Sequence, residues 1–116
     1  MNKIINGLSI VSTPIGNLDD ITYRAVTTLK DCDIIICENP KHSLKLLNKL
    51  GIKKKLIALH DYNEHKIINQ IKGLLKSKNC ALISDAGSPL ISDPGYNLVQ
   101  YCIKNNIGIT SVPGPS

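Results

Sequence analysis

The stretch CALISDAGSPLISDPGYNLVQYCIKNNIGITSV, residues 80–112, holds two short apolar runs on either side of a longer segment with a different pattern. The runs Cys80 to Ser84 and Gly108 to Val112 have the length and composition of buried strands. Between them, Gly95 to Asn105 places apolar residues three and four positions apart, which is typical of an amphipathic helix. A strand, a helix and a strand in this order predict a parallel β-α-β unit.

The same alternation extends back to the start of the chain. Three further short apolar runs predict strands at Leu8 to Ser12, Asp33 to Cys37 and Lys55 to Leu59. Three further segments with helical spacing lie between them, at Thr22 to Asp31, Ser43 to Leu50 and Glu64 to Lys76. Strands that are apolar on both faces are typical of parallel sheets covered by helices. We therefore predict an α/β fold with an open, mainly parallel five-stranded sheet and helices on both faces.

The composition agrees with one compact domain over residues 1–116. Hydrophobic residues make up 42% of the chain, which has no Phe or Trp, so the predicted core is aliphatic. No cleavable leader and no run near the ~20 apolar residues of a membrane span is present, so the cytoplasm is the expected location. The cysteines show no C-x-x-C spacing and fall in or beside apolar segments, which favours core positions over a metal site or disulfides: Cys32, Cys37, Cys80 and Cys102.

Positive charge is concentrated in one segment. The chain has 14 Lys and Arg against 9 Asp and Glu, a net charge of +5, and residues 41–55 hold six Lys and no acid. Such a patch neutralises the phosphates of nucleic acid or another anionic surface. Lysine-rich helix faces that contact only solvent are also common, so charge alone leaves both interpretations open.

Ligands of open parallel sheets bind outside the carboxyl ends of the strands, so the loops after the strands are the candidate sites. The first loop, Ser12 to Asp20, matches neither G-x-G-x-x-G nor the P-loop, which disfavours a dinucleotide or a triphosphate. Glu38 follows the second strand and is equally consistent with a functional carboxylate and with a solvated acid. The scattered histidines and one tyrosine are expected on solvated surfaces and predict no metal site: His42, His60, His65 and Tyr62.

The loop after the fourth strand, residues 84–95, contains Ser-Asp-x-Gly twice. Gly87 permits backbone conformations closed to other residues, and Pro89 fixes φ, so the loop can hold backbone groups rigidly toward a ligand. The alternative is a tight connection that only caps the following helix. For Asp85 to Ser88 we favour ligand binding, because Gly at a strand end often lets a ligand approach closely.

These loops, in this order and with this spacing, resemble the tetrapyrrole methylase superfamily, and within it the RsmI-type enzymes that methylate ribose in small-subunit ribosomal RNA. Ser12 to Ala25 is similar to the opening signature of that group, and Ser84 to Gly95 is similar to its central loop. Pro113 to Ser116 matches a third segment. A fourth is matched in part by Glu38 and residues of the following helix: Lys41, His42, Leu46 and Leu47.

The chain departs from that group at the second-strand loop, where Asn39, Pro40 and Lys41 replace the usual Asp, Thr and Arg. If this segment handles RNA, the carboxylate and the guanidinium fork are lost, and Lys does not replace a bidentate group. The departure affects the expected handling of substrate more than the expected binding of cofactor.

The resemblance implies S-adenosyl-L-methionine as methyl donor, 16S ribosomal RNA as substrate and a homodimer. It also implies a second α/β domain that closes the cleft, and Pro113 to Ser116 follows a strand where a domain junction is expected. Lys41, Lys45 and Lys49 are the expected RNA contacts. The positions that match donor-binding segments are Pro14, Ile15, Asp85, Ala86, Gly87, Ser88, Ile91, Gly114 and Ser116.

Methyl transfer to a ribose hydroxyl needs alignment and a base that removes the proton. Glu38 and Asp85 are both candidates for that base. Two other functions stay open at this stage: a methyltransferase of the same superfamily that acts on a corrin or porphyrin precursor, and a non-catalytic α/β binding module with a basic helix.

Overall fold

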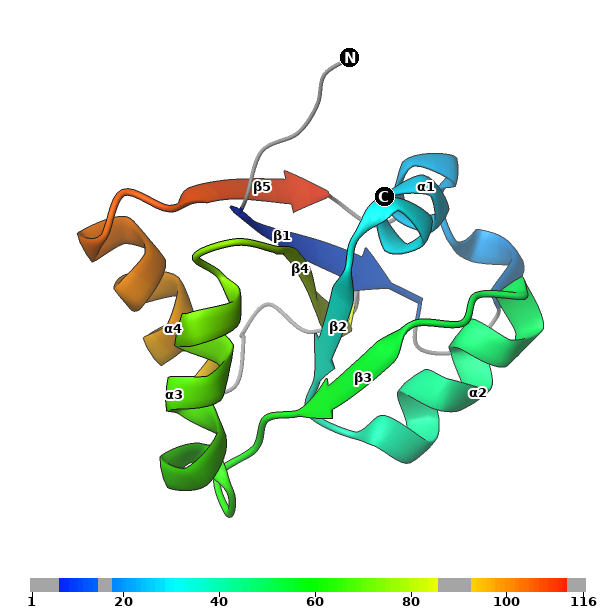
Figure 1. Cartoon of the computed structure of the whole chain (residues 1–116). Coiled ribbons are helices and arrows are strands. Elements are labelled where there is room, and N and C mark those ends of the chain that lie inside the picture. The colour runs from blue at the N-terminus through cyan, green and yellow to red at the C-terminus, as the bar shows by residue number, and fades with distance from the viewer. Residues whose placement is uncertain (1–6, 15–17, 86–92, 113–116) are drawn as a thin grey trace.

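The computed structural model describes residues 7–14, 18–85 and 93–112 (Figure 1). Strands and helices alternate along these residues, as the sequence pattern predicts. In chain order the elements are β1 (Gly7–Thr13), the short 3-10 helix η1 (Leu18–Asp20), α1 (Tyr23–Asp31), β2 (Ile34–Cys37), α2 (Pro40–Leu50), β3 (Lys55–Ala58), α3 (Glu64–Leu74), β4 (Asn79–Asp85), α4 (Asp93–Lys104) and β5 (Gly108–Val112).

The five strands form one sheet in the order β3-β2-β4-β1-β5. Every neighbouring pair is parallel, so the predicted α/β architecture is confirmed and the sheet is parallel throughout. The longest pairing joins β1 to β4, from Gly7 opposite Asn79 to Thr13 opposite Asp85. All carboxyl ends of the strands therefore meet at one edge of the sheet, which we call the carboxyl edge.

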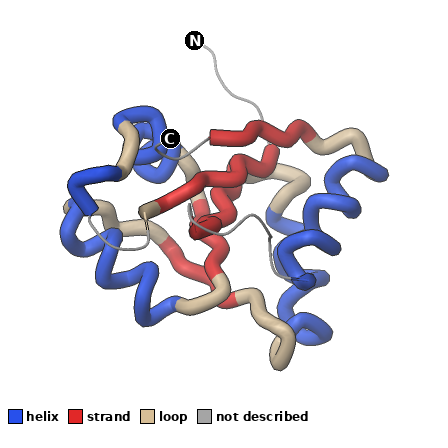
Figure 2. The backbone as a smooth tube through the Cα atoms, turned by 180° about the vertical axis from the view of Figure 1, so that it is seen from behind, coloured by secondary structure: helices blue, strands red, loops and turns tan. Residues whose placement is uncertain are grey.

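The helices cover both faces because the chain crosses the sheet in two directions. From β1 to β2 and β3 it moves one way across the strand order, and from β3 to β4 and β5 it moves the other way. Since β-α-β crossovers are right-handed, α1 and α2 lie on one face and α3 and α4 on the other (Figures 1 and 2). Two separate buried clusters confirm this layering: one joins the sheet to Ala25, Leu29 and Leu47, and the other joins it to Ile71, Leu75 and Leu98.

The start of α2 differs from the sequence prediction. The helix begins at Pro40, three residues before the predicted Ser43, because Asn39 acts as its N-cap. The Asn39 side-chain oxygen accepts a hydrogen bond from the backbone N–H of His42 at 3.3 Å, and Pro40 occupies the first helical position, where a missing N–H costs nothing. At the other end, Gly51 adopts a left-handed conformation with φ 70°, as the predicted helix stop requires.

Several other predicted ends of strands and helices were wrong by one or two residues. β1 and β4 are each longer by one residue at both ends, because their parallel pairing continues past the apolar runs used to predict them. β2 starts one residue later and β3 stops one residue earlier than predicted. α3 stops at Leu74, and α4 starts at Asp93 and ends at Lys104. Only β5 has the predicted ends.

A pair of glycines gives a direct test of the pairing between β1 and β5. A Cβ on Gly7 would lie 2.8 Å from the backbone oxygen of Gly108, whereas a Cβ on Gly108 would meet nothing within 4 Å. Gly7→Ala is therefore expected to lower the free energy of unfolding by about 1 to 3 kcal/mol, the usual cost of overpacking. Gly108→Ala is the matched control, with an expected change within about 1 kcal/mol. Urea unfolding followed by circular dichroism compares the two, and equal effects would contradict the described β1–β5 contact.

Candidate functional site

The sheet order predicts a crevice, the expected ligand site of an open α/β sheet, between the ends of β1 and β4. These strands are neighbours, but the chain leaves β1 for a helix on one face and leaves β4 for a helix on the other. Two neighbouring connections that diverge in this way leave space between them at the carboxyl edge, which is where open α/β sheets bind ligands. The last residues paired there are Thr13 and Asp85.

The ends of β1 and β4 are joined at the base of this expected crevice. Thr13 is only 2% exposed, and its hydroxyl donates a hydrogen bond to the carbonyl oxygen of Ser84 at 3.4 Å, which ties β1 to β4 at their ends. Pro14 comes next and is buried, with φ fixed by its ring. The sequence prediction included Pro14 but missed Thr13, whose signal is a polar residue at the end of an otherwise apolar strand. The Thr13 hydroxyl donates its hydrogen bond to Ser84, which links the two strand ends.

Most of the predicted donor-binding positions lie outside the described residues. These are Ile15, Ala86, Gly87, Ser88, Ile91, Gly114 and Ser116. Asp85 is the last residue of β4, although its side chain is not described. The loop that carries most of these positions leaves β4 at Asp85 and enters α4 at Asp93, so both of its ends lie at the carboxyl edge.

Glu38 lies at the same edge and is exposed. It follows β2, whose Ile36 pairs with Leu82 of β4, so it stands one strand away from the crevice. The edge continues into β3, where the backbone N–H of Leu59 donates to the carbonyl oxygen of Cys37 at 2.8 Å. The structure therefore brings Pro14, Glu38 and the end of β4 to one edge, as the sequence predicts.

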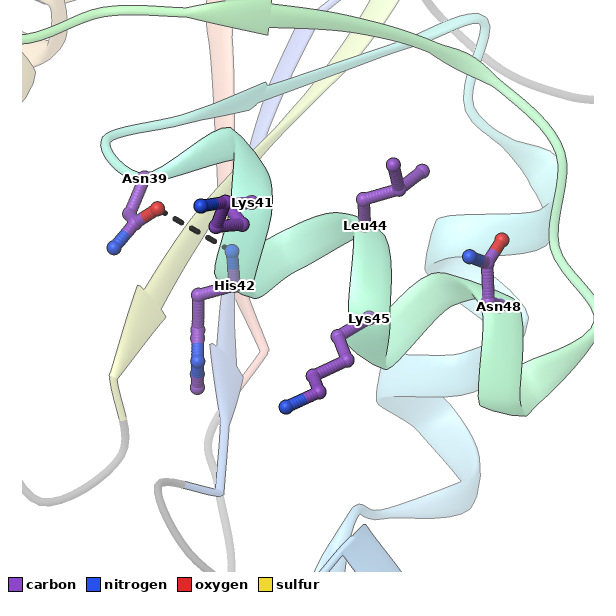
Figure 3. A pocket seen from close by; sticks show the side chains of 6 residues that line it. All are labelled: Asn39, Lys41, His42, Leu44, Lys45 and Asn48. Atoms are coloured by element: carbon purple, nitrogen blue, oxygen red, sulfur yellow. Dashed lines mark hydrogen bonds between the residues drawn. The ribbon is translucent and has the colours of Figure 1, made fainter.

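The predicted RNA-binding lysines follow one side of α2. Lys41, Lys45 and Lys49 are exposed and four residues apart, which puts them about 6 Å apart along the helix axis. Two of them line an open groove of about 450 Å³ that begins at the N-cap of α2 (Figure 3). The residues that line it carry polar or cationic end groups apart from one leucine, although the stems of their side chains make much of the surface apolar: Asn39, Lys41, His42, Leu44, Lys45 and Asn48. Lys49 lies one turn further along and outside this lining.

The groove begins at the carboxyl edge because α2 starts directly after Glu38. From there the helix runs toward the opposite edge, where Lys53 and Lys54 lie exposed before β3. A row of cations therefore leads from the carboxyl edge, at the end of β2, along the whole length of α2. This arrangement attracts an extended polyanion rather than a single small anion.

The four cysteines are free and buried, which confirms that they are core residues. Burial raises the pKa of the Cys32 and Cys80 thiols to about 11, and it raises the pKa of Cys37 and Cys102 as well. At pH 8 the thiolate, which is the reactive form, is therefore scarce.

We expect iodoacetamide at pH 8 to label these four cysteines at least about tenfold more slowly in the folded protein than in urea. Burial blocks the approach of the reagent and keeps the thiols protonated. Intact-mass spectrometry measures the labelling. Rapid labelling without urea would contradict the buried positions.

Histidines provide no metal site in the part of the chain that the structure describes. His42 and His65 are exposed and His60 is half-buried, as expected of solvated or loop histidines. Within residues 7–14, 18–85 and 93–112, no three His, Cys, Asp or Glu side chains come together in a way that would hold a metal ion. No helix within those same ranges is long and apolar enough to cross a membrane.

Comparison with known proteins agrees with this geometry. A sequence model of the family described as Tetrapyrrole (Corrin/Porphyrin) Methylases matches residues 7–116. The chain is 52% identical over 117 residues to "Ribosomal RNA small subunit methyltransferase I" of Thermotoga maritima, a match that covers 100% of this chain and 51% of that protein. A protein of the same name from Pasteurella multocida is 47% identical over 98% of this chain and 41% of its own length. The chain thus spans about half the length of these relatives.

Solved structures share the fold at low sequence identity. Diphthine synthase superposes with a TM-score of 0.72 and 14% identity, over 94% of this chain and 44% of that one. A cobalt precorrin-4 methyltransferase superposes with a TM-score of 0.74 and 16% identity, over 95% of this chain and 46% of that one. At these identities the likeness shows the fold alone.

Proposed function

Because the chain belongs to the tetrapyrrole (corrin/porphyrin) methylase family, we propose that the protein transfers a methyl group from S-adenosyl-L-methionine to a cytidine ribose 2'-hydroxyl of 16S ribosomal RNA. The observation that carries the donor half is the sheet order, which puts the expected ligand crevice of the fold at the ends of β1 and β4. The RNA half is supported by the lysines on α2 and by the names of the relatives, which are ribosomal RNA small subunit methyltransferases. A ribosomal substrate would place the protein in the cytoplasm.

In this proposal the donor lies against the carboxyl edge, with Pro14 and Ile15 on one side and the β4–α4 loop on the other. The structure supplies a firm support for the β1 side, since Pro14 is buried and Thr13 is bonded to β4. The remaining proposed contacts come from the loops after β4 and β5: Asp85, Ala86, Gly87, Ser88, Ile91, Gly114 and Ser116. A second α/β domain and a second copy of the protein complete the proposed enzyme.

The donor supplies an electrophilic methyl group that already carries a good leaving group. The protein therefore has to align the ribose oxygen with that methyl group, exclude water and remove one proton. We assign the proton removal to Glu38 in the first place, because it is exposed at the carboxyl edge beside the start of the lysine row. Asp85 is the alternative base. The lysines of α2 hold RNA phosphates, which orients the strand without identifying its sequence.

Two measurements on the complete protein test the proposal. Isothermal titration with S-adenosylmethionine is expected to show a single class of sites, and radioactive methyl transfer to small ribosomal subunits is expected to depend on the enzyme. Donor binding with transfer only to a corrin or porphyrin precursor would assign a different substrate. A protein that binds no donor would be a binding module and would end the proposal.

A further inference from the structure

Exposed tyrosines gather at the carboxyl edge. The chain has four tyrosines and contains neither Phe nor Trp. Tyr62 is 96% exposed, Tyr23 is 86% exposed and Tyr96 is 57% exposed, and each lies just before or within the first turn of a helix that follows a strand. The fourth, Tyr101, is half-buried beneath the ammonium group of Lys72, 4.7 Å from the ring centroid.

Tyr62 differs from the others because it stands on a turn held by side-chain hydrogen bonds. The Asn63 side chain accepts from the backbone N–H of His60 at 2.9 Å and donates to the carbonyl oxygen of Ala58, also at 2.9 Å. The backbone N–H of Tyr62 itself donates to Nδ1 of His60 at 3.2 Å. The backbone on both sides of Tyr62 is therefore fixed, while its ring remains in solvent.

The His60 ring approaches Tyr62 edge to face, with 5.9 Å between the ring centroids and 60° between the planes. Such pairs are favourable. Tyr62 is 96% exposed, so this contact leaves most of its ring open to another flat ring. The hydrogen bonds that hold the backbone of the turn lower the conformational entropy lost on binding.

The turn follows β3, the strand next to the one that leads into the basic groove, and continues into α3 on the face opposite α2. The pairing of β2 with β3 ends where Cys37 lies opposite Ala58. Asn39 and His60 therefore each lie two residues beyond the last paired residue of their strand. The groove that begins at Asn39 contains Lys41 and Lys45 and no acidic residue. Cations that hold the backbone and an exposed aromatic ring at the same edge of the sheet are the two elements that bind single-stranded nucleic acid.

We propose that Tyr62 stacks on an unpaired base of the RNA substrate, next to the phosphates held by α2. This inference rests on the proposed function and adds a positioning residue to it. The charge of the groove decides between possible occupants, because a nucleic acid strand brings phosphates to Lys41 and Lys45 as well as a flat ring to Tyr62. If Tyr62 serves another protein surface instead, the following test will show no preference for bases that depends on Tyr62.

The test compares two strands with equal numbers of phosphates: single-stranded oligocytidine and an abasic strand of the same length. The complete wild-type protein is expected to bind oligocytidine more tightly than the abasic strand. Tyr62→Ala is expected to weaken binding of oligocytidine roughly tenfold, within the range for loss of one stacked base, and to leave binding of the abasic strand nearly unchanged. Tyr62→Phe and Tyr62→Trp, which keep a flat ring, are expected to restore the preference.

Ile103→Ala is the control, since Ile103 is 59% exposed in the last turns of α4, at the opposite edge of the sheet. Equal loss on both strands in Tyr62→Ala, no loss on either, or a wild type without preference for bases would each overturn the inference. Titration with S-adenosylmethionine reports on the proposed function separately. A donor-binding Tyr62→Ala protein that keeps its preference for bases would refute the stacking role alone.

Discussion

Glu38→Gln in the complete protein is expected to lower the turnover of methyl transfer about a hundredfold, while the affinity for S-adenosylmethionine stays nearly constant. Glutamine keeps the size of the side chain but cannot accept a proton, and a positioned base contributes at least about a hundredfold in typical enzymes. Glu38 is exposed at the carboxyl edge, one strand from the crevice, so it is placed for substrate rather than for the core. Single-turnover transfer to small ribosomal subunits measures the rate, and isothermal titration measures the affinity.

Asp31→Asn is the matched control, because Asp31 is also exposed but ends α1 at the opposite edge of the sheet. Its turnover is expected to equal that of the wild type. Asp85→Asn separates the two candidate bases. Since Asp85 is also a proposed donor contact, its loss is expected to weaken donor binding along with turnover. Unchanged turnover in Glu38→Gln together with a slow Asp85→Asn would move the base to Asp85.

The alternation of strands and helices could be predicted from sequence because each element here has a strong local pattern. β2 is four consecutive buried residues, and the apolar positions of α3 repeat every three or four residues. The order of the strands has no such local signal. β1 lies between β4 and β5, which are far from it in sequence, and that placement depends on how complete strands pair. The position of the expected crevice depends on this order. From the sequence we could therefore predict only that a ligand binds at the carboxyl ends of the strands, and not between which strands.

Local chemistry also explains where the site predictions were incomplete. The segment Asn39-Pro40 departs from the pattern of the similar methyltransferases, yet in the structure it forms a regular helix start. Asn accepts the capping hydrogen bond as Asp would, and Pro is well suited to the first helical position. Thr13 was missed for a different reason, because its hydrogen-bond partner, the Ser84 carbonyl, is distant in sequence. Tyr62 was expected on a solvated surface, and the structure confirms its exposure.

Replacing Lys41, Lys45 and Lys49 together by Ala is expected to reduce the salt dependence of RNA binding. Each lysine that neutralises a phosphate releases counterions and adds about 0.7 to 0.9 to the slope of log affinity against log salt concentration. Three contacts contribute about 2 to 3 to that slope. Between about 50 mM and 200 mM salt, the wild type is therefore expected to lose roughly 20- to 40-fold more affinity than the triple variant. Filter binding of a small-subunit RNA fragment across this range measures both slopes.

The control for this variant removes the same amount of charge from elsewhere in the protein. Lys66, Lys78 and Lys104 are exposed and lie in or next to α3 and α4, which cover the other face of the sheet. If only net charge attracts RNA, both triple variants will show the same slope. If the row on α2 holds the phosphates, only the α2 variant will lose slope, because counterions are released where the strand lies. Equal slopes would remove the reason to place RNA on α2, and Tyr62 would then lose the neighbouring cations on which its proposed stacking depends.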